Sequence, residues 1–431
     1  MATRYAYWRS ASGRAGKGDS AKYAPTPILA QLGKISEPAG KDSIHWSDFT
    51  FHRLETALLS AWVVLYPSGE ELNENDAASI LRGAIADTIR GTGGATPLSE
   101  ALVLKNADAR AAAFFRRPTT RFVLVASLSI DRLPFKSARI GDCLLQPLRS
   151  RDHFPPPQRA YSDPQIATHL NSSHYALVRV SVPGRSTHEA SERAIFAIDL
   201  LRALWSIRTT SRWSISFGVR KKPIGMVHSG PVYTLHCDPR DPIDTFWLDR
   251  HRQPDRDLFV PKADIWPALE RSRKWLLRRL ATHKFRSDLE PLLVRYVQAL
   301  DQPDFDSAFL KMWSILEQLT DTVGRYEETA RRAASPFDDH ELVRSILECL
   351  RSRRNLYVHS AAEKADTDQA VYIVKNFVEV HLLSAIRNSF EITRLEDYAK
   401  ELARGRNVEV LRRERQALSR AIRAIERRGS S

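Results

Sequence analysis

The sequence predicts an α+β N-terminal domain over residues 1–263 followed by an all-α C-terminal domain over residues 264–431. Strand-like and helix-like hydrophobic periods alternate over residues 44–240, which indicates a sheet with helices packed on it. Prolines among many charges interrupt residues 238–263, and beyond them helical spacing prevails. The length of 431 residues also favours at least two domains, because single cores stop growing at about 250–300 residues.

The clearest predicted strand covers residues 121–130, in which every second side chain is apolar. A second strand is predicted at residues 175–182. Shorter apolar stretches predict further strands at residues 213–219, 224–227 and 232–236.

A helix is predicted to begin after Ser186. Ser186 and Glu189 form a capping-box pattern, in which each side chain can satisfy a free backbone donor of the first helical turn. Apolar residues then recur at helical spacing at Ala194, Ile198, Leu201 and Trp205.

The predicted C-terminal domain contains an amphipathic helix over residues 306–323. Its start can be capped by Asp304 or Asp306. Its apolar stripe consists of Phe309, Trp313, Leu316, Thr320 and Val323. Further helices are expected over residues 338–354, 366–393 and 395–428.

Composition excludes several classes of protein. Apolar residues make up 43% and charged residues 27%, as in ordinary globular domains. Three widely spaced cysteines give no disulfide framework, and no apolar run approaches the roughly 20 residues of a membrane span. The N-terminus has no apolar stretch typical of a signal peptide. We therefore expect a cytoplasmic protein without a membrane segment.

The net charge of +14 favours a polyanionic partner such as RNA. The excess of bases is unevenly placed. Residues 1–270 carry 35 bases and 27 acids, residues 271–399 carry 20 of each, and residues 400–431 carry ten and four. The charge therefore predicts where RNA is gathered, and it does not identify a catalytic group.

The most specific motif is Arg-Asn-x3-His, formed by Arg354, Asn355 and His359. The simpler pattern Arg-x4-His is uninformative, because 50 Arg and 13 His in 431 residues give roughly 1.5 matches by chance and the chain contains two. Requiring Asn after the Arg lowers the chance expectation to roughly 0.03. Only the match that begins at Arg354 meets this requirement.

This motif, preceded by two predicted helices, resembles the HEPN superfamily and within it the ApeA-like HEPN proteins. The resemblance covers roughly residues 285–395. It implies an all-α HEPN-type helical bundle that usually dimerises, and a metal-independent endoribonuclease of toxin and anti-phage defence systems. Arg354 and His359 would be catalytic, and Asn355 would be their polar companion. Many relatives carry an aromatic residue two positions after the His, whereas here that position is Ala361 and a tyrosine precedes the His at Tyr357.

The side chains of the motif suit RNA cleavage without a metal or other cofactor. Histidine titrates near neutrality and can take a proton from a 2′-hydroxyl, and arginine stays charged and binds phosphate oxygens. On an ideal helix, residues five apart point about 140° away from each other. Arg354 and His359 therefore share a site only if His359 lies beyond the helix end or if two subunits contribute. We expect a homodimer formed through the helical domain.

Other interpretations of these residues remain open. Arg354 and His359 can simply cap a helix C-terminus. Glu317 can face the motif and orient Arg354 or His359, or it can be a solvated or capping carboxylate. Two alternatives to the nuclease also remain open. One is a catalytically silent HEPN domain that binds RNA or a nucleotide without cleaving it, and the other is an adaptor that only dimerises.

Expectations follow for four further features of the chain. Cys349 lies on an apolar stripe and is expected in the core of the bundle. His228, His236 and Cys237 lack the ligand spacing of a metal site, so no metal is predicted. The basic tail over residues 400–428 is interpreted either as a solvated helix packed along one edge or as an arm that steers RNA. The N-terminal domain is expected to sense an unknown trigger and to regulate the helical domain.

Overall fold

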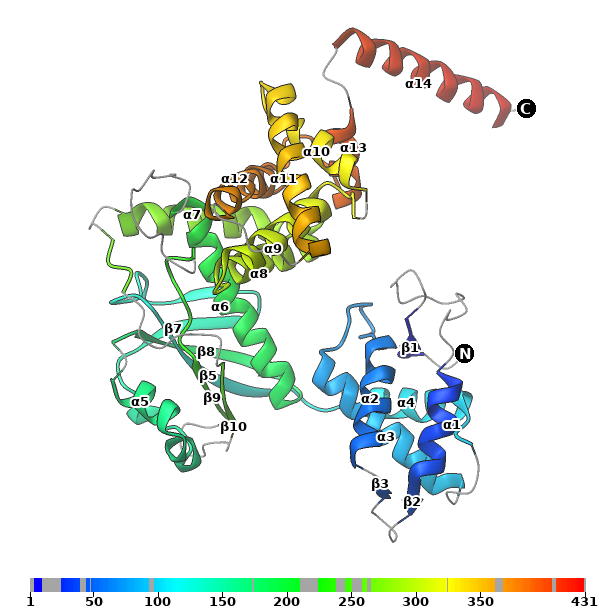
Figure 1. Ribbon diagram of the computed structural model, residues 1–431, viewed down its shortest axis with the longest axis vertical. Helices are drawn as coiled ribbons and strands as arrows, with labels where there is room; N and C mark the ends of the chain where they lie inside the picture. Colours follow the sequence, from blue (N-terminus) through cyan, green and yellow to red (C-terminus); the bar gives the residue numbers. More distant parts are fainter. Residues whose placement is uncertain are drawn as a thin grey trace.

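The chain contains many helices, a six-stranded antiparallel sheet and two short two-stranded sheets in a computed structural model (Figure 1). The structure describes residues 4–9, 25–38, 44–46, 48–92, 97–172, 174–209, 224–237, 245–249, 258–261, 265–323, 325–360, 367–404 and 408–429. In this described part, no helix is both long and apolar enough to cross a bilayer.

The first 115 residues form a small unit with its own core. Its elements are β1 (Ala6–Trp8), α1 (Thr26–Ile35), β2 (Ser36–Pro38), β3 (Ile44–Trp46), α2 (Asp48–Ala61), β4 (Trp62–Val64), α3 (Glu74–Thr92) and α4 (Glu100–Phe115). β1 pairs antiparallel with β4, and the rings of Trp8 and Trp62 meet edge to face at 4.8 Å. The buried apolar residues from Ala6 to Phe114 form one cluster that is separate from the larger core of the chain.

The large antiparallel sheet has the strand order β10-β9-β5-β8-β7-β6. Its strands are β5 (Thr120–Leu128), β6 (Ala138–Ile140), β7 (Cys143–Leu148), β8 (Ala176–Gly184), β9 (Val232–His236) and β10 (Thr245–Leu248). Short helices follow β7, namely η1 (Arg151–His153), η2 (Gln158–Ser162) and α5 (Pro164–Ser172). The central strand β5 carries Leu124, Ala126 and Leu128 toward one large core, as its alternating pattern predicts.

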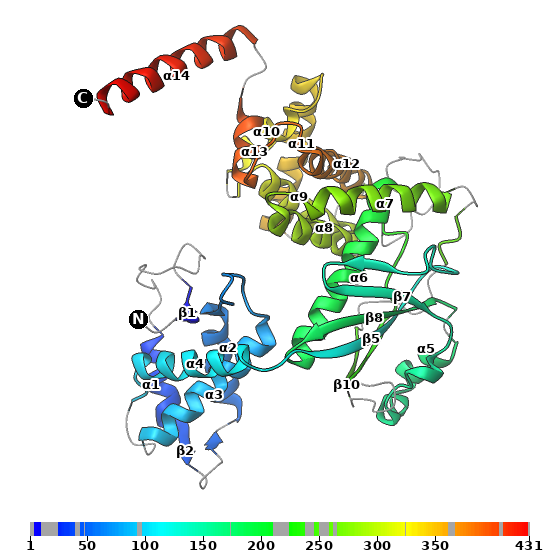
Figure 2. The same ribbon diagram turned by 180° about the vertical axis from the view of Figure 1, so that it is seen from behind.

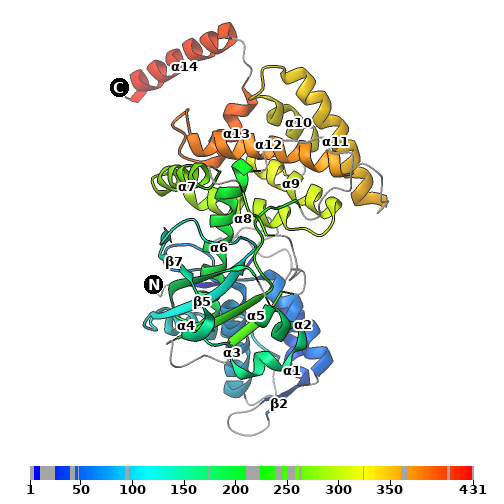
Figure 3. The ribbon, with the colours of Figure 1, turned by 90° about the vertical axis from the view of Figure 1, so that its left-hand side faces the viewer.

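The long helix α6 (Thr187–Thr209) covers that face of the sheet (Figure 3). The Oγ of Ser186 accepts a hydrogen bond from the backbone N–H of Glu189 at 2.9 Å, as predicted. The carboxylate of Glu189 accepts from the N–H of Arg185 at 2.6 Å instead of from Ser186. The predicted apolar positions from Ala194 to Trp205 are buried.

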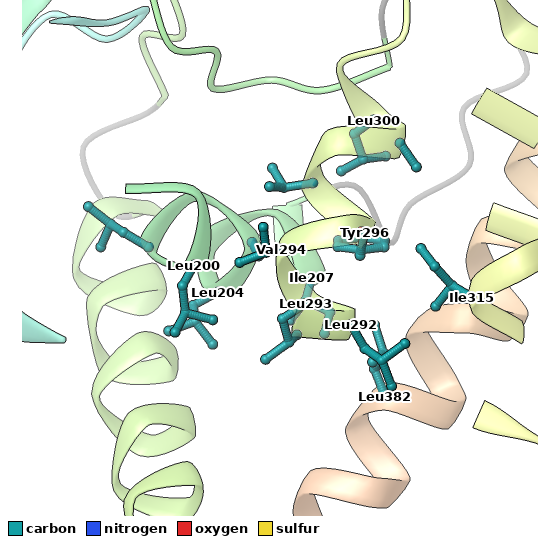
Figure 4. Packing of buried hydrophobic residues seen from close by; sticks show 14 of the residues in the cluster. Leu200, Leu204, Ile207, Leu292, Leu293, Val294, Tyr296, Leu300, Ile315 and Leu382 are labelled. Carbon is teal, nitrogen blue, oxygen red and sulfur yellow. The ribbon is translucent and has the colours of Figure 1, made fainter. Parts of the chain in front are cut away.

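A layer of helices packs on the other side of α6. It contains α7 (Ile265–Ala281), α8 (Arg286–Leu300), α9 (Phe305–Leu319), α10 (Tyr326–Ala334), α11 (His340–Ser360), α12 (Thr367–Arg387) and α13 (Leu395–Ala403), and α14 (Val408–Gly429) follows this layer in the chain. Figure 4 shows Leu200 and Leu204 of α6 facing the Leu292 and Leu293 side of α8, while Leu382 of α12 approaches α8 from beyond it. One buried cluster therefore runs from the sheet through α6 into the helical layer.

Buried charges join the same layers. The guanidinium of Arg202 in α6 is fully buried and pairs with Asp199 at 2.7 Å and with Asp301, which follows α8, at 2.5 Å. In α7, Glu270 accepts two hydrogen bonds from Arg273 and one from the indole N–H of Trp205. The expected boundary at 263/264 adjoins residues outside the described part, and the apolar core continues across it.

Several expected elements differ from the structure. Residues 224–227 form bends, so the predicted strand there is wrong, and residues 213–219 lie outside the described residues. The helix expected to end at 393 ends at Arg387, because Asn388 has a φ of 48° and its side chain bonds both backbone groups of Ile392. The single helix expected over 395–428 is two helices, since Arg404 has extended backbone after α13.

Candidate functional site

Helix α9 positions the first side chain of the candidate site. The carboxylate of Asp304 accepts a hydrogen bond from the N–H of Ser307 at 2.6 Å, so Asp304 provides the cap. Phe309, Trp313 and Leu316 are buried along one side, as their spacing predicts. This packing fixes the helix that carries Glu317.

Glu317 is buried, and its Oε1 accepts a hydrogen bond from the indole N–H of Trp313 at 2.8 Å. Burial raises the pKa of Glu317, while the Trp313 hydrogen bond and the positive charge of Arg354 act in the opposite direction. The charge effect places Glu317 within electrostatic range of Arg354 on α11. Glu317 is buried and is therefore not a solvated residue.

Helix α11 carries the whole Arg-Asn-x3-His motif. It continues to Ser360, so the prediction that the helix stops at residue 354 is wrong. Arg354 is half-buried. The side chains of Asn355, Tyr357 and His359 lie outside the described residues, although their backbone belongs to the helix. A continuous helix places residues 354 and 359 about 140° apart around its axis.

The first turns of α10 hold α11 from one side. The Nη1 of Arg351 lies 3.7 Å from the carboxylate of Glu327. Glu328 pairs with Arg331 and Arg332, and the hydrogen bonds and charges of these arginines lower the pKa of Glu328 to about 2. Arg332 also donates to the carbonyl of Thr320 at the end of α9. These contacts tie α9, α10 and α11 into one arrangement.

Buried polar side chains of α12 fix the rest of the bundle. Lys375 is fully buried and lies 2.7 Å from Glu379, which also accepts a hydrogen bond from the hydroxyl of Tyr296 in α8. His381 contacts the Ala333 carbonyl through Nε2 at 2.9 Å and the Tyr398 hydroxyl through Nδ1 at 3.0 Å. Sequence reasoning missed these residues. The only signal was a set of charged side chains on an otherwise apolar helix.

Two other expectations about this half are wrong. Cys349 is exposed, because it lies on the outer side of α11. Helix α14 does not pack along an edge of the bundle: its described side chains are exposed apart from the half-exposed Leu411, and the helix stands away from the others (Figures 1 and 2). Its exposed large apolar residues are Val408, Val410, Leu418, Ile422 and Ile425.

The described residues include no candidate metal site. No group of three or more His, Cys, Asp or Glu side chains is arranged there to hold an ion. His228 instead faces Asp301 at 3.2 Å, and His236 faces Thr234 at 3.0 Å.

Comparison of the chain with protein-family models, with curated proteins and with solved structures gives no match. The functional argument therefore depends on the motif and on the contacts around it.

Proposed function

We propose that the protein is a metal-independent endoribonuclease whose helices α7–α14 form an HEPN-type bundle. The single observation that carries the proposal is the presence of a buried carboxylate within electrostatic range of the first residue of a rare motif. The positive charge of Arg354, the first residue of Arg-Asn-x3-His, acts on the buried carboxylate of Glu317 in α9 and opposes the rise in its pKa. A solvent-exposed helix-capping arginine has no need of such a partner.

The proposed reaction divides two tasks between His359 and Arg354. His359 takes the proton of a ribose 2′-hydroxyl, and the resulting oxygen attacks the adjacent phosphorus. Arg354 offsets the negative charge that develops on the phosphoryl oxygens. The bond to the 5′-oxygen of the next nucleotide then breaks, which leaves a 2′,3′-cyclic phosphate, and the protonated His359 returns its proton to the departing 5′-oxygen. DNA lacks the 2′-hydroxyl, so the same site should leave DNA intact.

Because α11 continues through the motif, we propose that the site forms between two subunits. Positions 354 and 359 lie about 140° apart around one helix, whereas a two-fold axis beside α11 would bring Arg354 of one copy toward His359 of the other. A homodimer formed through the helical domain supplies two such sites.

Helix α14 supports the proposal of RNA as the substrate. It carries seven arginines and three glutamates, and it is exposed. Arg412, Arg420 and Arg423 lie within one 80° sector of the helix, opposite the apolar residues. Such a row of guanidinium groups neutralises phosphates along a strand and concentrates RNA near the bundle.

We further propose that the protein is a cytoplasmic toxin or anti-phage defence effector whose N-terminal regions hold the nuclease in check until a trigger arrives. An unregulated ribonuclease is toxic to its own cell, and the layered contacts of α6 with α7 and α8 provide a physical route for control.

The test is induced expression of the wild type, Arg354→Ala and His359→Ala, with growth and total RNA integrity followed together. The wild type should cleave purified RNA in the presence of a chelator, and each variant should lose at least about 100-fold in rate. RNA binding without cleavage by the wild type would favour the silent alternative. Unchanged cleavage by His359→Ala would reject the proposed mechanism.

A further inference from the structure

The sheet has a second face, opposite α6, which the proposed nuclease does not use. Because side chains alternate along strands, this face carries Val123 and Val125 of β5, Arg179 of β8, and Thr234 and His236 of β9. In the strand register, Val125 lies between Arg179 and Thr234, and Val123 lies opposite His236. Phe154, which follows η1, packs on the two valines.

Three nitrogen atoms on this face are buried without a hydrogen-bond partner. They are Nη1 of Arg151, Nε of Arg179 and Nδ1 of His236. His236 itself is 0% exposed, and its other ring nitrogen, Nε2, lies 3.0 Å from the hydroxyl of Thr234. If that hydroxyl donates to Nε2, Nδ1 carries the proton and becomes a free donor.

These groups lie close to one another. The ring of Phe154 is 5.4 Å from the ring of His236, which places η1 and its Arg151 over β9. The charge of Arg151 adds to burial in lowering the pKa of His236 to about 4, so the imidazole is neutral at pH 7. The strand register places Arg179 on the same face, across Val125 from Thr234. Two cations and a neutral imidazole therefore belong to one face of the sheet.

Among the described residues, the buried arginines Arg202 and Arg273 are matched by carboxylates. Arg202 pairs with Asp199 and Asp301, and Arg273 makes two hydrogen bonds to Glu270. Arg151 differs, because burial lowers its pKa to about 10 and the hydroxyl of Tyr161 is the one group that opposes this effect. Arg151 and Arg179 are each half-buried, and each holds one nitrogen that is buried without an acceptor. Leaving such a donor without an acceptor is unfavourable, and an anion would satisfy both donors and offset both positive charges.

We propose that this face of the sheet is a binding site for a phosphate group, whose oxygens accept hydrogen bonds from Arg151 Nη1, Arg179 Nε and His236 Nδ1. Guanidinium groups suit phosphate because they present several fixed N–H donors to its oxygens. The phosphate can be free or part of a nucleotide, since both present the same oxygens. This site does not depend on the proposed nuclease activity.

The proposal is tested on the full chain by calorimetric titration with inorganic phosphate and, separately, with adenosine monophosphate. The wild type should bind at least one of them, and Arg151→Met should weaken that binding by at least about tenfold. Tighter binding of the nucleotide assigns a phosphoester, and tighter binding of phosphate assigns the free ion. Arg132→Met is the matched control, because the Arg132 side chain is 82% exposed, and it should bind as the wild type does.

Thermal unfolding without ligand gives a second, independent readout. Arg151→Met removes a nitrogen that is buried without a partner and should melt above the wild type. Added phosphate should raise the melting temperature of the wild type more than that of the variant. Arg179→Met repeats the test at a second donor if Arg151→Met does not fold. Two results would overturn the proposal: no binding of either probe by the wild type at about 10 mM, or binding that both methionine variants leave unchanged.

Discussion

The indole N–H of Trp313 donates a hydrogen bond to the buried carboxylate of Glu317 at 2.8 Å, and the positive charge of Arg354 in α11 opposes the rise that burial causes in the pKa of this carboxylate. The hydrogen bond restrains the carboxylate within α9. We expect its negative charge to favour one orientation of Arg354. Glu317 is therefore proposed as a positioning residue for the cleavage.

Replacing this carboxylate should slow RNA cleavage without removing a reacting group. Glu317→Gln keeps an acceptor for Trp313 but loses the charge that orients Arg354, so we expect a loss of about tenfold in kcat. The pH profile should also change. Because burial raises the pKa of Glu317, its protonation contributes to the loss of wild-type activity at acidic pH, and the Gln variant should lose that contribution.

The matched control for Glu317 is Glu348→Gln. Glu348 lies on α11 itself, half-exposed, where it pairs with Arg344 at 2.9 Å. It should change neither the rate nor its pH profile. If Glu317→Gln slowed cleavage by the same factor at every pH, the carboxylate would have only a structural role.

The continuous α11 leads to a complementation experiment. Arg354→Ala and His359→Ala should each be inactive, but a mixture of the two proteins forms heterodimers in which one site receives Arg354 from one copy and His359 from the other. Random exchange should restore about one quarter of the wild-type rate. A mixture as inactive as its components would show that both residues act within one subunit.

The two domains expected from the sequence do not coincide with the two cores of the structure. Residues 6–115 have a core of their own, whereas the sheet, α6 and the later helices share one. Removal of residues 1–117 leaves a chain that begins at Pro118, and this chain should unfold cooperatively and stay soluble. Removal of residues 1–262 exposes Leu292 and Leu293 of α8 and should cause aggregation, as measured by gel filtration. Equal solubility of both truncated chains would contradict this division.

Local patterns predicted most elements that bury one face. The alternation in β5 and the Ser186 cap of α6 follow from neighbouring residues, and the structure confirms them. The stripe of α9 is confirmed from Phe309 to Thr320, but the helix ends at Leu319 and the predicted Val323 is exposed. The end of α11 was misjudged because Asn355 and His359 are weak helix formers, and periodicity alone does not show that the helix continues to Ser360.

Local sequence patterns do not predict contacts between residues that are distant in the chain. For Glu317, the sequence leaves two possibilities open, namely a carboxylate that faces the motif and a solvated or capping carboxylate. His381 and the carbonyl of Ala333 lie 48 positions apart, and no local pattern connects them. The same holds for Arg151 and His236, whose proximity depends on the order of strands in the sheet.

Helix α14 should govern how strongly RNA binding depends on salt. Ending the chain after Arg404 removes seven arginines of α14, so the slope of log affinity against log salt should become less steep and affinity at low salt should fall. Changing Arg412, Arg420 and Arg423 to Gln should reduce the slope by about two to three. The apolar residues of α14 provide a control, since Leu418→Ala should leave the slope unchanged. An identical slope with and without α14 would exclude it as an RNA contact.

The buried imidazole of His381 should make the helical bundle sensitive to acid. Burial lowers the pKa of His381 from its ordinary 6.5 to about 4, so between these values the unfolded chain binds a proton that the folded chain does not. The free energy of unfolding should therefore fall as pH decreases from about 6.5 to 4, by at most about 3 kcal/mol from this residue. His381→Gln can still bond Ala333 and Tyr398, and it should weaken this pH dependence in chemical denaturation. His340→Gln, at the exposed start of α11, should retain the full dependence, and the same curve for all three proteins would show that His381 does not titrate on unfolding.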